Sequence, residues 1–211
     1  HTRYTVVSWA GDVYKRQIYD NALSKDECYE IVNEFETSKD KQKHGVTGPT
    51  YEPDPDNKIS TEITYFLDDD SLISNILIKK LRIYIEKYKE EYPDIDTALD
   101  AWTAALGYNV QKYRPSEGYF SQHCETHDML TAPRVLVWMF YLNSLDDGGT
   151  DFPRYNMTTD AVEGRLVLWP SYWTHVHKGH ISHTQTKYIA TGWFAFQNPD
   201  YPSVFGTGYD V

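Results

Sequence analysis

The strongest constraint on the fold of this chain is a run of short β-rich segments that fills its second half. Between Leu106 and Phe196, runs of β-branched and aromatic residues alternate with turn-forming stretches such as Asp146-Asp147-Gly148-Gly149 and Val162-Glu163-Gly164. The predicted strands are Leu106–Tyr113, Tyr119–Glu125, Arg134–Leu142, Arg165–Trp169, Thr174–Lys178 and Lys187–Phe196. Many short strands in succession predict a β-sandwich or jelly roll.

Amphipathic helices are predicted ahead of these strands. Ser24 followed by Glu27 forms a capping box, and apolar residues then recur at helical spacing from Cys28 through Ile31 and Val32 to Phe35. A second helix is predicted to start at a cap on Asp69 or Asp70 and to end near Pro93, and a third spans Asp94 to Thr103. Helices followed by strands predict an α+β fold, with a β core buttressed by N-terminal helices.

The length of 211 residues fits one domain, which we place at residues 17–211. Residues 1–16 show no clear period, and we expect either a non-native or a flexible tail there. Residues 38–60 are polar and predict a long loop, which is either a lid over a binding site or a merely disordered connection.

Charge and cysteine content exclude several classes of function. A formal net charge of −11 argues against non-specific binding to nucleic acid or to an anionic membrane, because phosphate binding needs an excess of Lys and Arg. No apolar run approaches eighteen residues and no cleavable signal is visible. Cys28 and Cys124 are too few for a disulfide framework, which favours a reducing, cytoplasmic location.

Six of the eight histidines fall in two clusters, and this pattern indicates the chemistry. The first cluster runs from His123 to Asp128 and the second from His175 to His183. On an extended strand, His123 and Glu125 point the same way, so a distant histidine would complete a 2-His-1-carboxylate site with three open positions. Such a site suits Fe(II) with a 2-oxo acid and dioxygen. The alternative is two surface polar residues on a strand edge.

Longer segments around these clusters resemble the prolyl 4-hydroxylase-like family of Fe(II)- and 2-oxoglutarate-dependent dioxygenases. The resemblance rests on Tyr113–Glu125, Arg134–Leu142, Asp146–Pro153, Glu163–Pro170, and the ten-residue step from His177 to Lys187. It covers roughly residues 17–197 and is closest to the short forms of phages and bacteria. It implies a double-stranded β-helix, or cupin-like jelly roll, as the core.

The same resemblance implies the roles of individual residues. The implied metal ligands are His123, Glu125 and His177. The implied 2-oxoglutarate residues are Lys187, Tyr113 and Thr150, with Trp193 packed against the co-substrate or the iron ligands. The commonest first motif of the family is His-x-Asp, whereas this chain has His-x-Glu. A retained carboxylate favours hydroxylation over halogenation, which would need a vacated position.

The remaining members of the two clusters have alternative roles. We expect His175 and His177 on one face of a strand, and the spacing to Lys187 selects His177 as ligand, with His175 beside the site. His180 and His183 are expected to be solvated in a turn. His127 lies either at the substrate mouth or on a surface loop. A zinc site built from Cys124, His123, His127 and His177 is disfavoured because strand geometry turns Cys124 away.

The resemblance implies decarboxylation of 2-oxoglutarate to succinate, coupled to hydroxylation of an unactivated C–H bond. The implied cofactors are Fe(II), 2-oxoglutarate and O2, with ascorbate in support. A peptidyl proline is the expected substrate, and Trp138, Tyr172 and Trp173 are candidates for stacking on a proline-rich peptide. A free amino acid, another small molecule, a non-catalytic cupin-like metal-binding module, and a capsid or receptor-binding jelly roll remain the alternatives.

Overall fold

The computed structural model describes residues 15–47 and 52–197, and their core is formed by antiparallel sheets. The large sheet has the order β1 (Gln17–Tyr19), β11 (Leu166–Pro170), β8 (Arg134–Tyr141), β13 (Lys187–Phe196), β6 (Gly107–Tyr113), β4 (Thr61–Phe66) and β2 (Lys43–His44), with β5 (Trp102–Ala104) also on β13. A smaller sheet contains β10 (Met157–Thr159), β9 (Thr150–Phe152) and β12 (Lys178–Gly179), and β3 (Lys58–Ile59) pairs with β7 (Gly118–Tyr119).

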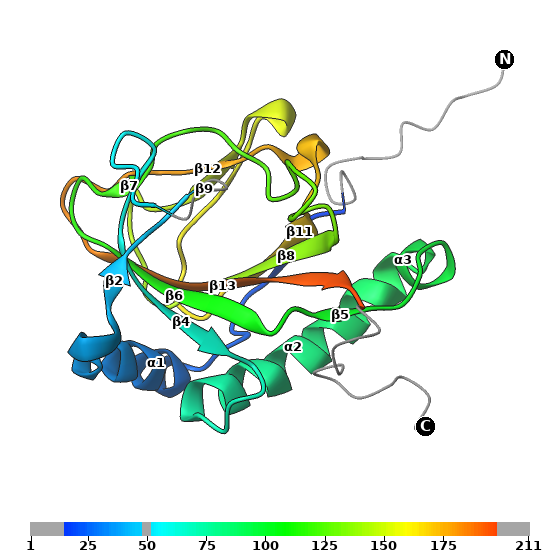
Figure 1. Cartoon of the computed structure of the whole chain (residues 1–211), viewed down its shortest axis with the longest axis horizontal. Helices are drawn as coiled ribbons and strands as arrows, with labels where there is room; N and C mark the ends of the chain where they lie inside the picture. Colours follow the sequence, from blue (N-terminus) through cyan, green and yellow to red (C-terminus); the bar gives the residue numbers. More distant parts are fainter. Residues whose placement is uncertain (1–14, 48–51, 198–211) are drawn as a thin grey trace, which may run out of the picture.

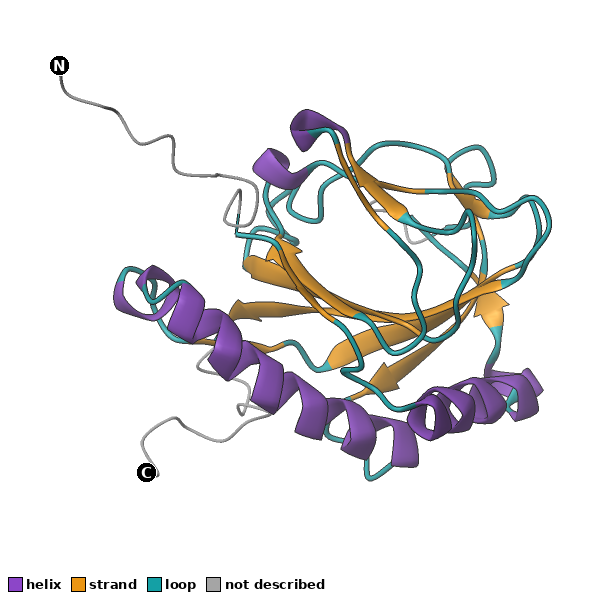
Figure 2. Cartoon of the chain, turned by 180° about the vertical axis from the view of Figure 1, so that it is seen from behind, coloured by secondary structure: helices purple, strands orange, loops and turns teal. Residues whose placement is uncertain are grey.

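Helices cover one side of the large sheet (Figures 1 and 2). They are α1 (Lys25–Thr37), α2 (Leu72–Glu91) and the short α3 (Asp94–Thr97). Apolar residues spaced along α1 and α2, such as Phe35 and Leu77, are buried in one cluster with Trp138 and Phe140 of β8. This packing confirms the expected arrangement of N-terminal helices buttressing a β core.

The two predicted helix starts had different outcomes. At α1, Glu27 N–H donates to Ser24 Oγ at 3.1 Å and Ser24 N–H donates to Glu27 Oε2 at 2.7 Å, so the predicted capping box is confirmed. At α2 the prediction of an aspartate cap was wrong. Ser71 is the cap, because its hydroxyl accepts from Ser74 N–H at 3.1 Å, while Asp69 accepts from Ser71 N–H at 3.2 Å.

Strand β8 is buried on both faces, and its alternation separates the two cores of the protein. Val137, Met139 and Tyr141 face the small sheet, in a cluster with Trp169 and Phe152. Leu136, Trp138 and Phe140 face the helices. Trp138 is 0% exposed, so the prediction that it stacks on a substrate peptide was wrong. Trp173, by contrast, is 64% exposed.

Three predicted elements differ from those in the structure. Of the strand predicted over residues 119–125, only Gly118–Tyr119 is a regular strand, and His123 then forms an isolated bridge with His177. The strand predicted over residues 174–178 is a 3-10 helix, Trp173–His175, followed by β12. The third predicted helix ends at Thr97, and β5 follows. The bridge joins residues far apart in the chain, and the two helical segments are too short to show a period, so none of the three leaves a periodic signal in the sequence.

Several short strands were missed by sequence analysis, and the predicted 38–60 loop contains some of them. The described part of that loop holds a 3-10 helix, Lys39–Lys41, together with β2 and β3. Strands β4, β9 and β10 were also missed. The pattern in β4 was obscured because its inward-facing Glu62 is a buried charged residue.

Residues 1–14 lie outside the described part, so a non-native or flexible tail stays a prediction there. The two described residues before β1 contact the body. Tyr88 Oη donates to the Lys15 carbonyl at 2.6 Å, and the Arg16 guanidinium lies 5.3 Å from the centroid of the Phe152 ring. Among the described helices, none combines the length and apolar character needed to cross a bilayer.

Candidate metal centre

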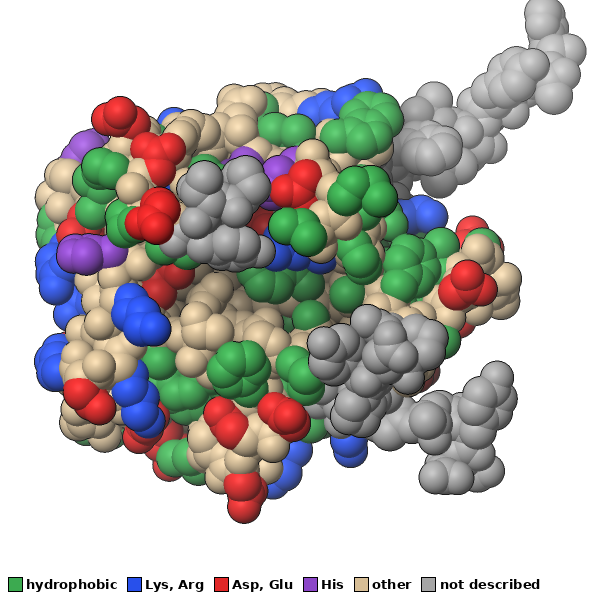
Figure 3. Space-filling model, viewed as in Figure 1, with side chains coloured by type: hydrophobic (Ala, Val, Ile, Leu, Met, Phe, Trp, Pro, Cys, Tyr) green, Lys and Arg blue, Asp and Glu red, His purple; other side chains and the backbone are tan. Residues whose placement is uncertain are grey.

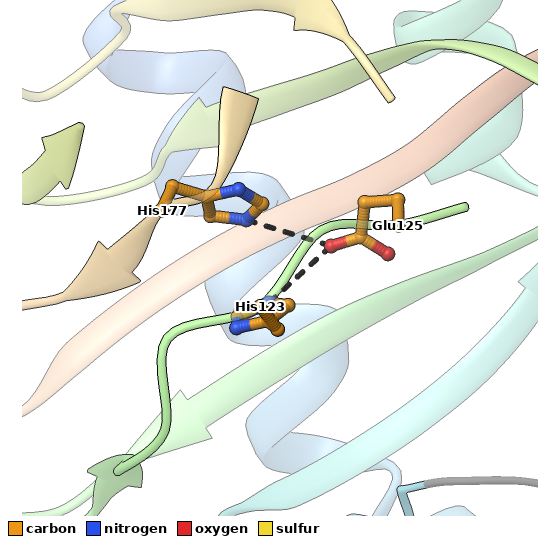
Figure 4. Close-up of side chains that lie close together, drawn as sticks. All are labelled: His123, Glu125 and His177. Carbon is orange, nitrogen blue, oxygen red and sulfur yellow. Dashed lines mark ion pairs between the residues drawn. The ribbon is translucent and has the colours of Figure 1, made fainter. Parts of the chain in front are cut away.

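Three side chains from two distant segments of the sequence converge at one point (Figure 4). Glu125 Oε1 lies 3.4 Å from His123 Nε2 and 3.5 Å from His177 Nε2. One ligand atom from each residue lies within 4.8 Å of the others. The convergence does not need a regular strand, because the backbone of His123 bonds that of His177 in both directions, at 3.0 and 2.9 Å.

Backbone carbonyls set the orientation of both imidazoles. His123 Nδ1–H donates to the Ser121 carbonyl at 3.2 Å, and His177 Nδ1–H donates to the His175 carbonyl at 3.0 Å. A histidine that donates from Nδ1 leaves the lone pair of Nε2 free to bind a metal. Both lone pairs are therefore directed toward the side where Glu125 lies.

Aromatic rings hold these imidazoles in place. Tyr119 stacks on His123 with ring centroids 3.8 Å apart and planes inclined by 14°. Trp169 packs edge-on against His177, with centroids 5.0 Å apart. Packing thus fixes the two imidazoles, which would lower the entropy cost of binding a metal between them.

The Glu125 carboxylate is held as an anion. Burial alone would raise its pKa, but contacts with His123 and His177 outweigh burial and hold the pKa of Glu125 well below its ordinary value. Its second oxygen, Oε2, accepts from Trp193 Nε1–H at 3.0 Å and from Arg134 Nη1–H at 3.3 Å. Trp193, predicted beside the co-substrate or the ligands, therefore contacts a ligand.

The donor set fits Fe(II). Two neutral imidazole nitrogens and one carboxylate oxygen on one side of a metal, with the other positions open, form the arrangement of non-haem iron oxygenases. The predicted zinc alternative is not supported, because the described metal-ligating group does not include Cys124. The Cys124 thiol instead donates to the Thr126 carbonyl at 3.3 Å.

A buried cation lies in the same cavity as the metal ligands. Lys187 is 7% exposed, and its Nζ donates to the His180 carbonyl at 3.0 Å. Among the described residues its ammonium forms no ion pair, and burial lowers the pKa of Lys187 to about 8, against a smaller opposing effect of Asp147. A buried charge without a counter-ion is costly, so this position fits an anionic ligand. Gly179 leaves room for it, because a Cβ there would lie 3.2 Å from Nζ.

The other two predicted co-substrate residues line the same cavity as Lys187. Lys187 is paired in register with Tyr113, and its Nζ lies 5.1 Å from the centroid of that ring. Tyr113 Oη donates to Gln111 Oε1 at 2.8 Å, and burial raises the pKa of Tyr113 well above its ordinary value, so it stays a neutral donor. The Thr150 and Tyr141 hydroxyls share a hydrogen bond at 2.6 Å.

One cavity of about 1050 Å³ joins the three candidate metal ligands to Lys187. Its described lining includes His123, Glu125, His177, Lys187, Tyr113, Thr150 and Trp193. Figure 3 shows the recess in the face that also carries histidine side chains near its rim. The structure thus brings together every residue that the sequence singled out for metal and co-substrate.

The other histidines take different places. His175 lies in the 3-10 helix and packs against Tyr155, with ring centroids 5.3 Å apart, so the expectation of a shared strand face with His177 was wrong. His127 is one of the residues that line the cavity. His180 pairs with Asp151 at 2.5 Å and His183 bonds the Ser116 hydroxyl at 3.0 Å, so neither is simply solvated.

Arg134 and a polar wall of the cavity were not predicted from the sequence. Arg134 was read only as the first residue of a strand. The wall contains a buried ion pair between Lys58 and Glu62, and Ser60 Oγ donates to Glu62 Oε1 at 2.7 Å. A basic residue at the start of an otherwise apolar strand was the only available signal for Arg134.

Residues 108–195 match the family model described as the 2OG-Fe(II) oxygenase superfamily. This segment is therefore similar to 2OG-Fe(II) oxygenase domains. The predicted class, a 2-oxoglutarate-dependent non-haem iron dioxygenase, and the predicted cofactors Fe(II), 2-oxoglutarate and O2 are thereby confirmed. The match spans all seven residues that the sequence assigned to the site. A search of curated protein sequences finds no match.

Solved structures similar to this oxygenase include three prolyl hydroxylases. The viral collagen prolyl hydroxylase of Paramecium bursaria Chlorella virus-1, solved with 2-oxoglutarate, has a TM-score of 0.66 and 18% identity over 89% of this chain and 99% of its own. A Pseudomonas putida prolyl-4-hydroxylase has a TM-score of 0.63 and 14% identity over 89% and 95%.

The third is a Trichoplax adhaerens prolyl hydroxylase, solved with a peptide fragment of the hypoxia inducible factor oxygen degradation domain. Its TM-score is 0.66 and its identity 16%, over 87% of this chain and 84% of its own. At such low identities these likenesses establish the fold, and they confirm that the oxygenase has the predicted double-stranded β-helix architecture.

Proposed function

We propose that the oxygenase hydroxylates a peptidyl proline, with His123, Glu125 and His177 as iron ligands and Lys187, Tyr113 and Thr150 as the 2-oxoglutarate residues. The observation that carries the proposal is the placement of both groups in one cavity. A structural metal site would need neither open coordination positions nor a buried lysine without a counter-ion. This argues against a non-catalytic cupin-like module.

Each residue has a defined task. His123 and His177 present Nε2, and Glu125 presents Oε1, to the metal. Lys187 pairs with the far carboxylate of 2-oxoglutarate, and the hydroxyls of Tyr113 and Thr150 hydrogen-bond it. Iron held by His123, Glu125 and His177 would supply the activation of dioxygen, with one oxygen atom going to succinate as 2-oxoglutarate loses CO2 and the other entering the substrate C–H bond. The cavity walls orient the substrate C–H bond and exclude bulk water.

The cavity also supports a peptide as the substrate. Beyond the residues proposed for iron and 2-oxoglutarate, its described lining includes Thr47, Glu52, Pro53, His127 and Leu130, so the cavity has further wall that a larger substrate could contact. The volume of about 1050 Å³ is much larger than a five-carbon acid requires. Two similar enzymes are named as a collagen prolyl hydroxylase and as a prolyl hydroxylase solved with a peptide fragment.

The test is succinate release from 2-oxoglutarate under air, with Fe(II) and ascorbate, in the presence and absence of a proline-rich peptide. His177→Ala is the control, because it removes one ligand from the interior while leaving the helices untouched. Succinate that the peptide raises and the variant loses supports the proposal. Iron-dependent succinate that no peptide raises would redirect the search to free amino acids and other small molecules. Absence of succinate above the His177→Ala background, in protein that holds iron, would refute catalysis.

A further inference from the structure

The Glu125 carboxylate is gripped on the side that faces away from the two histidines. Trp193 Nε1–H donates to Oε2 at 3.0 Å, and Arg134 Nη1–H donates to Oε2 at 3.3 Å and to the Glu125 main-chain carbonyl at 3.0 Å. The Arg134 guanidinium lies 3.7 Å from the centroid of the Trp193 ring, so the two donors also stabilise each other. We call this pair the Arg134–Trp193 clamp.

A β-bulge brings Arg134 to the cavity. On β8, Val137 and Met139 face the cavity while Leu136 faces the helices, so strict alternation would turn Arg134 toward the helices. The pairing of β8 with β13 changes register between Phe194 and Ala195, so that Ala195 pairs with Arg134. Bulges that re-aim one side chain recur beside active sites, and this one places Arg134 over Trp193.

The clamp addresses a difficulty that a glutamate creates at this position. A carboxylate on a long arm can bind a metal through both oxygens, and this would use one of the three positions that 2-oxoglutarate and dioxygen need. Here Oε1 faces the two imidazoles while Oε2 is occupied by charge-assisted and indole N–H donors. We propose that the Arg134–Trp193 clamp holds Glu125 to one-oxygen binding and so allows a glutamate to serve where aspartate is the commoner ligand. This inference rests on the proposed ligand set.

The clamp is tested by counting the open positions with Mn²⁺ as the probe. Water-proton relaxation by bound Mn²⁺ reports the number of exchangeable waters, which for three protein ligands on a six-coordinate ion is about three. Trp193→Phe keeps the stacking ring and removes the donor, and Arg134→Lys keeps the charge and removes the planar fork. In each variant we expect the water number to fall by about one third, with the Mn²⁺ dissociation constant within about threefold of the wild type.

Trp102→Phe is the matched control, because Trp102 is a tryptophan on neighbouring β5 whose Nε1–H donates to the Ile95 carbonyl at 3.1 Å. It should leave the water number unchanged. An unchanged water number in both clamp variants would overturn the inference, and so would a large loss of Mn²⁺ affinity without loss of a water. Wild-type protein that binds no Mn²⁺ would refute the proposed ligand set itself.

A double-mutant cycle then shows whether the clamp acts through Glu125. The shorter arm of Glu125→Asp withdraws the carboxylate from the two donors, so adding Trp193→Phe to it should not change the water number further. If Trp193→Phe removes a water equally in the glutamate and aspartate backgrounds, Trp193 acts independently of Glu125 and the inference is wrong.

Discussion

Replacing Lys187 by methionine should stabilise the metal-free oxygenase at neutral pH. The ammonium is buried, forms no ion pair among the described residues, and has its pKa lowered from 10.5 to about 8. Lowering the pKa of Lys187 by this amount corresponds to about 3 kcal/mol of unfavourable free energy for holding the charge in the folded state. The variant also loses the hydrogen bond to the His180 carbonyl, which destabilises it by about 1 kcal/mol. The free energy of unfolding of Lys187→Met should therefore be about 2 kcal/mol higher than that of the wild type.

The pH dependence of this gain has a defined sign. Between pH 8 and 10.5 the unfolded chain keeps a proton on Lys187 that the folded chain has released, so wild-type stability rises with pH in that window. The advantage of Lys187→Met should therefore be full at pH 7 and shrink as the pH increases through 8. Urea unfolding of both proteins at pH 7, 8, 9 and 10 measures the difference directly.

The same substitution should cost the co-substrate its counter-ion. Removing one partner of a buried ion pair costs about 3 kcal/mol or more, which corresponds to a loss of more than about 100-fold in 2-oxoglutarate affinity. Calorimetric titration of the Mn²⁺-loaded protein should show this loss with little change in Mn²⁺ affinity. The reasoning would be refuted by a Lys187→Met protein that is less stable at pH 7, by a difference that is constant from pH 7 to 10, or by equal weakening of both affinities.

Three further substitutions test separate parts of the structure. Gly179→Ala places a Cβ 3.2 Å from Lys187 Nζ, and calorimetry should show 2-oxoglutarate binding weakened several-fold with an unchanged melting temperature. Unaltered binding would contradict the assigned position of the ammonium. Ser24→Ala removes the α1 cap and should lower the free energy of unfolding in urea by about 1 kcal/mol without changing succinate release. Lower activity at saturating Fe(II) and 2-oxoglutarate would show that the helix does more than buttress the sheet. Gly192→Ala would bring a Cβ to 2.5 Å from the buried Trp138 ring, so soluble yield and melting temperature should both drop, and a neutral result would mean that this core repacks freely.

Local patterns in the sequence were enough for the strongest elements of the fold. The capping box at Ser24 and the apolar spacing of α1 depend on residues within a few positions of each other, so they could be read directly. The strand Lys187–Phe196 was predicted with its observed bounds because a long alternating run carries its own period.

The segments whose secondary structure was predicted wrongly are those that have no repeating pattern of their own. The bridge between His123 and His177 joins two irregular segments, and the 3-10 helix at Trp173–His175 replaces the strand expected there. Neither has a repeating pattern: the bridge joins residues far apart in the chain, and the 3-10 helix is a single local turn in which His175 N–H donates to the Tyr172 carbonyl at 2.8 Å. The burial of Trp138 against the helices likewise depended on which face of β8 they cover.

For the site, the sequence by itself determined which residue types and spacings were available: a His-x-Glu pair, a distant histidine, and a lysine ten residues beyond it. Motif and spacing were enough to propose the candidate ligands, because His123 and Glu125 share a segment and the family resemblance implied the other residues. Only the tertiary structure decided that Trp193 and Arg134 grip the free oxygen of Glu125. A bulge in the pairing of two strands turns Arg134 into the cavity, and register between strands is set by packing across the whole sheet rather than by either strand alone.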